Sequence, residues 1–354
     1  MLPHRTDQFL GLASLALVAA AHAQDAPRTA AQILRDFDRV AMPSFSDGSD
    51  SESVKRFKAA IEKGCRQKAE FAAELQRKHP DHERLPEVLS IRWAGMTNAL
   101  GMADDVAKEL ATLLQADKLR ADVKREAVQA RARAMLVSKS FDNLARLDAV
   151  SAVLEDREGD DGHAASLLLD FVEDHVVDPE TQRTLLGIAI DRWPDDPYGG
   201  RPAKRWLALV DRIGKPFVEQ LPAEHRAWFG ETTTGDAEFT IVQVWMGWVN
   251  DRDGDGKDPE LAALQQLRQD LGDRVRVLGL VDGKLEERRP AMQQAGVDWP
   301  QHEFTDQEPM RTPFGAPRVG FYFVLDQKLQ VAGVVGRAAS LRERIDQLRA
   351  QAAR

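Results

Sequence analysis

The chain has 354 residues, 43% of them hydrophobic, and a formal net charge of −9 with acidic and basic residues interspersed. This length is enough for two domains of ordinary size. The acidic balance argues against nucleic acid or an anionic membrane as the main partner. The single cysteine, Cys65, excludes an intramolecular disulfide, so hydrophobic packing must hold the fold together.

Residues 1–23 predict an export signal. A short, weakly basic start precedes an apolar run over 9–21, and Ala21 and Ala23 form an A-x-A cleavage pattern. The apolar run is shorter than the roughly 20 residues that a membrane-spanning helix needs. We therefore expect cleavage after Ala23 and an exported protein, periplasmic or extracellular, with no membrane insertion after cleavage. An uncleaved anchor is the alternative.

The next part of the chain is predicted to be a flexible segment followed by helices. Residues 24–50 lead into the polar stretch PSFSDGSDSES, which is typical of a flexible segment. Over 51–211 apolar residues recur at helical spacing, as in VKRFKAAI, and prolines stand at the boundaries. This predicts an all-helical domain. Proline–aspartate turns that lead to Trp93 and to Trp206 leave two possibilities open, helix-pair repeats of the tetratricopeptide kind and an irregular bundle.

After residue 211 strand and helix patterns alternate. EFTIVQVWMGW, RVRVLGLV, GFYFVLD and LQVAGVVG are rich in β-branched and aromatic residues and predict strands. DPELAALQQLRQDLG, KLEERRPAMQQAG and SLRERIDQLRAQ predict helices, the first of them bounded by Pro259 and Gly272. This order predicts an α/β domain with a central mixed sheet over residues 212–354.

Three segments of this domain carry a resemblance to a known family. The strand IVQVWMGWV has Trp245 and Trp248 in a W-x-x-W pattern, and DPELAALQQL and the hairpin GFYFVLDQKLQVAGVVG follow it. Their order and spacing resemble the thioredoxin-like superfamily, and most closely its exported thiol–disulfide oxidoreductases of the TlpA type. The resemblance implies a thioredoxin-like fold for 212–354. It also implies two cysteines directly after the W-x-x-W strand, one that attacks a disulfide as a thiolate and one that resolves the mixed disulfide.

The chain lacks that cysteine pair. By position the two cysteines would fall at Val249 and at Arg252, or one or two residues after Arg252. The cis-proline of the family would fall at Gly320, and Pro317 takes that role only if the loop is bulged. Neither valine nor arginine can perform thiol–disulfide exchange. We therefore lean against an enzyme and expect no catalytic residues and no cofactor.

The loop NDRDGDGKD stands where the cysteines would be. Asp251, Asp253 and Asp255 match the first ligand positions of a calcium loop. Ala262 occupies the position of the bidentate glutamate, and Glu260 replaces it only with a different geometry. We prefer a solvated loop whose carboxylates favour the N-terminus of the following helix. A calcium site is the alternative.

Three further features have both a bland and a functional interpretation. Cys65 has basic neighbours that favour a thiolate but no partner thiol in the chain, and we prefer an inert, partly buried cysteine. His79 and His82 lack the further ligands that a zinc site needs. Trp245 and Trp248 are expected to pack in the core, since aromatic residues of strands usually point inward.

The sequence thus predicts an exported, non-catalytic protein. A helical domain and a redox-inactive thioredoxin-like domain would bind a protein or peptide partner, or serve as a scaffold. The first alternative is a thiol–disulfide oxidoreductase that acts through a partner thiol or through Cys65. The second is a calcium-dependent module that uses Asp251, Asp253 and Asp255.

Overall fold

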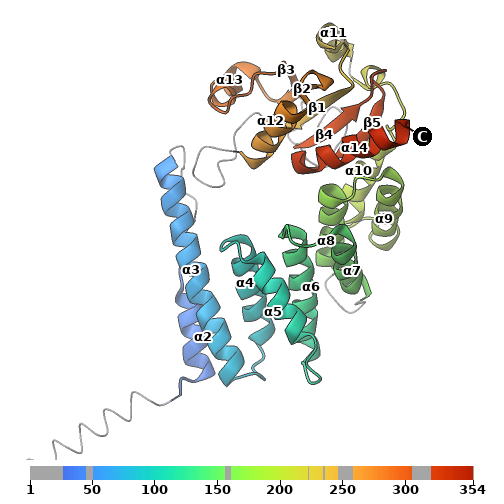
Figure 1. The fold of residues 1–354 in the computed structure, drawn as a ribbon. Coiled ribbons are helices and arrows are strands. Elements are labelled where there is room, and N and C mark those ends of the chain that lie inside the picture. Colours follow the sequence, from blue (N-terminus) through green and yellow to red (C-terminus); the bar gives the residue numbers. More distant parts are fainter. Residues whose placement is uncertain are drawn as a thin grey trace, which may run out of the picture.

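The structure is a computed structural model that shows a helical part followed by an α/β part with a mixed sheet, as the sequence predicts (Figure 1). In the part of the chain that it describes, none of the helices is both long and apolar enough to cross a membrane. The predicted signal segment 1–23 lies outside the described residues. These residues are 27–44, 51–155, 161–221, 223–233, 236–245, 258–304 and 320–353.

Helices follow one another from residue 30 to residue 210 and stack as pairs (Figure 1). They are α2 (Ala30–Arg39), α3 (Ser51–Lys78), α4 (Leu85–Asn98), α5 (Ala103–Leu113), α6 (Ala121–Val137), α7 (Asn143–Glu155), α8 (Asp161–His175), α9 (Pro179–Arg192) and α10 (Gly200–Val210). From α4 onward each even-numbered helix packs against the next even-numbered one, and each odd-numbered helix packs against both of its neighbours. Because α4, α6, α8 and α10 begin at residues 85, 121, 161 and 200, the pairs recur at a nearly regular interval. We call α2 to α10 the helix-pair array.

The two tryptophans of the weak sequence repeat are core residues of this array. Trp93 on α4 and Trp206 on α10 are both fully buried. The core continues from there into the sheet, because Trp206 meets Phe321 edge-on with ring centroids 6.0 Å apart. Gln182 on α9 also reaches the sheet, where its Nε2 donates to the carbonyl of Val334 at 3.4 Å. The array and the sheet therefore share one hydrophobic core.

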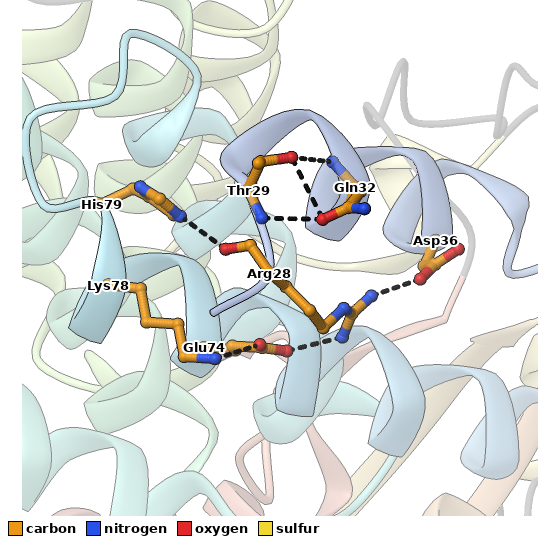
Figure 2. A network of polar contacts seen from close by, with 7 residues as sticks. All are labelled: Arg28, Thr29, Gln32, Asp36, Glu74, Lys78 and His79. Atoms are coloured by element: carbon orange, nitrogen blue, oxygen red, sulfur yellow. Dashed lines mark hydrogen bonds and ion pairs between the residues drawn. The ribbon is translucent and has the colours of Figure 1, made fainter. Parts of the chain in front are cut away.

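Helix α2 lies inside the segment 24–50 that the sequence predicts to be flexible. Thr29 and Gln32 form a capping box at its start, in which each side chain accepts from the backbone N–H of the other residue. The Arg28 guanidinium donates to Glu74 on α3 at 2.7 Å, and Figure 2 shows the surrounding polar network. The buried side chains of α2 are Ile33, Leu34 and Phe37. The prediction of a flexible segment is therefore wrong for residues 30–39, which form a short amphipathic helix packed on α3.

The sheet has the strand order β3-β2-β1-β4-β5. Its strands are β1 (Phe239–Trp245), β2 (Val275–Asp282), β3 (Gln301–Phe304), β4 (Phe321–Leu325) and β5 (Val331–Val335). The helices around it are η1 (Val218–Gln220), α11 (Ala223–Thr232), α12 (Pro259–Leu271), η2 (Gly272–Arg274), α13 (Leu285–Gln294), η3 (Ala338–Ser340) and α14 (Leu341–Ala352). Strand β2 runs parallel to β1 and β3, whereas β4 runs antiparallel to β1 and β5.

The two faces of the sheet pack against different partners, because successive side chains of a strand point to opposite faces. Ile241 and Trp245 of β1 lie in a core with α12 and α14. Val242 and Val244 belong to the core that continues into the helix-pair array. The array therefore covers one face of the sheet, and α12 and α14 cover the other.

Strand β3 was not among the predicted strands. Its sequence, QHEF, has one buried residue, Phe304, and no clear alternation. It forms because its backbone pairs in parallel with β2, with Gln301 opposite Gly279. The Gln301 side chain occupies the space over Gly279, where an added Cβ would lie 1.8 Å from its Oε1. Pairing with β2, rather than local pattern, creates this end strand.

Candidate functional site

The sequence directs attention to the corner where β1 ends and α12 begins. Asp258 and Glu260 on the α12 side of this corner are described, as are Gly320 and Tyr322 at the start of β4. The predicted site positions Trp248, Val249, Asp251, Arg252, Asp253 and Asp255 lie outside the described residues, as does Pro317. The missing cysteine pair and the calcium loop therefore stay predictions from the sequence.

Trp245 is part of the sheet core at this corner. Its ring is buried among the side chains under α12 and α14. Its indole N–H donates to the side-chain oxygen of Gln301 at 3.1 Å. The buried indole thus ties the end of β1 to the end strand β3, two strands away.

Gly320 stands where the resemblance noted in the sequence would place a cis-proline, and its backbone conformation explains why glycine stands there. Its φ is +93°, a region that side chains with a Cβ rarely adopt. Its N–H donates to the carbonyl of Val244 at 2.6 Å. Among the described residues no peptide bond is cis. The glycine lets the chain enter β4 through a turn that proline would not permit, since proline fixes φ near −65° and has no N–H.

The two carboxylates on the α12 side of the corner are already engaged in the fold. Asp258 caps α12 by accepting from the backbone N–H of Glu260 at 2.8 Å. Glu260 Oε2 accepts from the Ala338 N–H at 2.6 Å and from the Tyr322 hydroxyl at 3.3 Å. Its other oxygen lies 3.7 Å from Arg337. A role for Glu260 as a calcium ligand would compete with all three of these contacts.

Arg337 connects the corner to the helix-pair array. Its guanidinium donates to Asp174 at the end of α8 at 2.6 Å. Asp174, and to a smaller extent Glu260, raises the pKa of Arg337 above its usual range. Next to this pair the Ser340 hydroxyl donates to the backbone carbonyl of Asp174 at 3.0 Å. A polar bridge of Asp174, Arg337, Glu260 and Tyr322 thus extends from α8 to β4.

Two buried polar side chains lie at the sheet end of this bridge. Tyr322 and Gln243 face each other across β4 and β1, and both are buried. Burial, followed by the nearby Glu260 and Asp258, raises the pKa of Tyr322 well above its usual range. The side-chain oxygen of Gln243 has no hydrogen-bond partner among the described residues. The described part of the corner therefore offers neutral hydrogen-bonding groups and an ion-pair network.

Cys65 lies in the array and not beside β1. It is on α3, where its Sγ would be 3.2 Å from a Cβ added to Gly95 of α4. The thiol is buried between the two helices. Burial raises its pKa, and this effect exceeds the opposite effect of Lys68. The basic residues around Cys65 thus do not make it a thiolate at neutral pH.

The histidines that the sequence analysis weighed as zinc ligands have local partners. His79 Nε2 lies 3.1 Å from the carbonyl of Arg28, and His82 Nδ1 accepts from the Arg84 N–H at 3.2 Å. Within the ranges that the structure describes, no group of three or more His, Cys, Asp and Glu side chains is arranged to hold a metal ion.

A cavity of about 380 Å³ on the array was not indicated by the sequence analysis. Helix α4 lines it with the apolar residues Ile91, Trp93 and Ala94 and with the polar residues Glu87, Ser90 and Thr97. Ile91 is 40% exposed, which is high for an isoleucine inside a helix. The members of the wall from α6 and α8 are Arg125, Glu126, Gln129, Ala130, Arg133 and His163. The regular interval between helix pairs would have indicated which faces of α4 and α6 lie side by side and line this cavity. The sequence does not show that interval, which becomes visible only in the structure.

Protein-family models, curated proteins and solved structures were compared with the chain, and none of them matches it. The class of protein is therefore defined by architecture. It is a helix-pair array whose last pairs carry an α/β domain with a mixed five-stranded sheet.

Proposed function

We propose that the chain is an exported, non-catalytic protein that binds a protein or peptide partner. The observation that carries the proposal is the cavity of about 380 Å³ on the stacked helices α4 and α6. Helix-pair arrays build extended binding surfaces, because each pair adds a row of side chains to one continuous face. The polar bridge between Arg337 and Asp174 fixes the sheet to the same array, so both parts act as one scaffold.

The wall of the cavity indicates the chemistry of the partner. Ile91 and Ala94 present apolar surface, and Gln129 adds a side chain that both donates and accepts hydrogen bonds. Glu126 and Arg133 are seven residues apart on α6 and so lie on one face of the helix with opposite charges. A mainly polar lining with charges of both signs and one apolar patch suits a peptide segment that presents one small apolar side chain among its backbone amides and polar side chains.

The sequence supports the remaining parts of the proposal. The α/β part has the strand, helix, strand, helix, hairpin, helix order that the resemblance implies, with the short strand β3 added before the hairpin, and we propose that it is thioredoxin-like. The absence of cysteines at Val249 and Arg252 favours binding over thiol–disulfide exchange. The signal pattern over 1–23 favours export, and so a periplasmic or extracellular location.

Selection of peptides from a random library with the mature full-length protein tests the binding role. Ile91→Arg should weaken the binding of the selected peptides at least tenfold, because the new side chain fills the cavity and adds a charge to it. Ile188→Arg is the matched control, since Ile188 on α9 is 41% exposed and does not line the cavity. Equal effects of the two variants, or the absence of any selected peptide, would refute the proposed site.

Reduction of insulin by dithiothreitol tests the non-catalytic part. The mature protein should leave the rate unchanged, because the one thiol of the chain is buried and has no partner thiol. An accelerated rate that disappears in Cys65→Ser would establish the oxidoreductase alternative instead.

A further inference from the structure

A histidine pair joins α11 to the end strand β3. His225 Nδ1 lies 2.8 Å from His302 Nε2, and the two rings are nearly perpendicular. Trp228, which is also on α11, stacks on His302 with ring centroids 4.6 Å apart and an interplanar angle of 12°. The two histidines are 77 residues apart in the chain. Their contact is therefore tertiary and holds a helix against the edge of the sheet.

The contact depends on the protonation of both rings. A hydrogen bond between two imidazoles needs one nitrogen that carries a proton and one that does not. The pair tolerates one additional proton, because a singly protonated pair still has a free acceptor nitrogen. When both rings are protonated, neither nitrogen can accept a hydrogen bond. Two N–H groups and two positive charges then face each other at the short distance that the hydrogen bond had set. Acid therefore converts the attraction between α11 and β3 into repulsion.

The surroundings of His302 keep that second proton off at neutral pH. Burial, and next the neighbouring His225, lowers the pKa of His302 below its usual range, whereas Glu303 raises it. Glu303 itself accepts from the Leu285 N–H at 2.9 Å. The charged side chains described on the elements packed around the pair are Glu219 of η1, Arg226 and Glu231 of α11, Arg276 and Asp282 of β2, Glu286, Glu287, Arg288 and Arg289 of α13, and Glu303 of β3. Of these, Glu303 is the one that acts on the pKa of His302.

Helix α11 covers parts of the protein that would change on release. Phe229 of α11 is buried and packs against Phe217, with ring centroids 5.1 Å apart. Strand β3 is one end of the sheet, and α11 packs against it. His302 is two residues before Phe304 and so lies on the same face of β3, where Phe304 belongs to the core that also holds Phe217 and Phe229. Release of α11 would thus expose Phe229 and the core side chains beneath it.

We propose that His225, His302 and Trp228 form an acid-sensitive latch. At neutral pH the hydrogen bond and the stacked indole hold α11 on β3. In acid a second proton on the pair places two positive charges against each other, α11 separates from β3, and Phe229 becomes accessible. The sign follows from proton binding, because the open state binds more protons than the closed state, so acid favours opening.

Hydrogen exchange of α11 in the mature full-length protein tests the latch. Protection of the peptide that covers 223–232, corrected for the intrinsic rate, should fall at least tenfold between pH 7.5 and pH 4.5. A tenfold change corresponds to one unit of difference in pKa between the closed and open states. His302→Gln and His225→Gln keep a hydrogen-bonding side chain that acid does not charge, so each should reduce the fall to less than about threefold.

His175→Gln provides the control. Burial also lowers the pKa of His175, but this ring lies at the end of α8, where its Nε2 is 2.9 Å from the carbonyl of Leu136. The control should keep the full fall in α11 protection. Far-UV circular dichroism at pH 7.5 confirms that each variant is folded. The proposal would be overturned if the wild-type protection did not change, or if the His225→Gln and His302→Gln variants showed a fall as large as that of the wild type.

Discussion

Gly200, the first residue of α10, is predicted to be a position where a single methyl group destabilises the protein strongly. A Cβ at this residue would lie 2.0 Å from the carbonyl oxygen of Trp193 and 2.9 Å from Cα of Pro194, whereas real Cβ contacts under 3.0 Å essentially do not occur. Both neighbours are backbone atoms, so no side-chain rotation relieves the overlap. In a close-packed region the chain must shift by roughly an ångström.

The expected loss follows from two effects. Overpacking of a close-packed region costs about 1–3 kcal/mol. The shift also weakens the hydrogen bond from the Gly200 N–H to the Trp193 carbonyl, now 3.0 Å long, which contributes about 1 kcal/mol. Gly200→Ala should therefore lower the free energy of unfolding by about 2–4 kcal/mol. Urea unfolding followed by far-UV circular dichroism measures this loss as a lower midpoint.

Gly187 provides the matched control in the neighbouring helix. It lies inside α9, and a Cβ there would meet nothing within 4 Å. Gly187→Ala should raise the free energy of unfolding by roughly 0.5–1 kcal/mol, because alanine loses less backbone entropy in a helix. Equal midpoints for Gly200→Ala and the wild type, or equal losses for the two alanine variants, would refute the argument from close approach.

Three further predictions concern the polar contacts and the thiol. Glu74→Gln removes the charge that binds Arg28 and should speed proteolysis between α2 and α3 several-fold, with a loss of about 1 kcal/mol. Unchanged proteolysis would show that apolar packing alone holds α2. Cys65 should react with iodoacetamide at pH 7.5 at least tenfold more slowly in the folded chain than in urea, because burial raises the pKa of the thiol. Equal rates would contradict its burial. Arg337→Met removes the guanidinium that pairs with Asp174 and should cost about 1–3 kcal/mol in urea unfolding. Asp174→Asn in the same chain should recover part of that loss, and simple additivity of the two changes would contradict the pairing.

Elements with a strong local signal were predictable from the sequence. Helix α12 begins at Pro259, after the cap Asp258, and ends before Gly272, whose φ is +56°. The apolar segments of β1, β2, β4 and β5 also form strands as predicted. In each case the residues that form the element also carry its pattern, so a single sequence is sufficient.

Elements that depend on distant partners were missed. Helix α2 spans 10 residues, and its stability comes in part from the pair between Arg28 and Glu74, which are 46 residues apart. An isolated helix of that length is marginal in water. Strand β3 needs β2, and the cavity on the array needs the stacking of α4 on α6. At the corner, the bridge between Glu260 and Arg337 joins residues 77 positions apart, and no pattern in the sequence marks that distance.

The shared core has a consequence for the synthesis of the protein. Trp206 of α10 completes the array, but the ring of Phe321 that covers it belongs to β4. Phe321 lies 115 residues after Trp206, which at ribosomal rates of about 5–20 residues per second takes roughly 6–23 s to synthesise. During this interval the apolar surface at the end of the array stays exposed to solvent. A nascent chain in that state binds chaperones or aggregates. Fragments that terminate before β4 should therefore accumulate as insoluble material, although every helix of the array is already present in them.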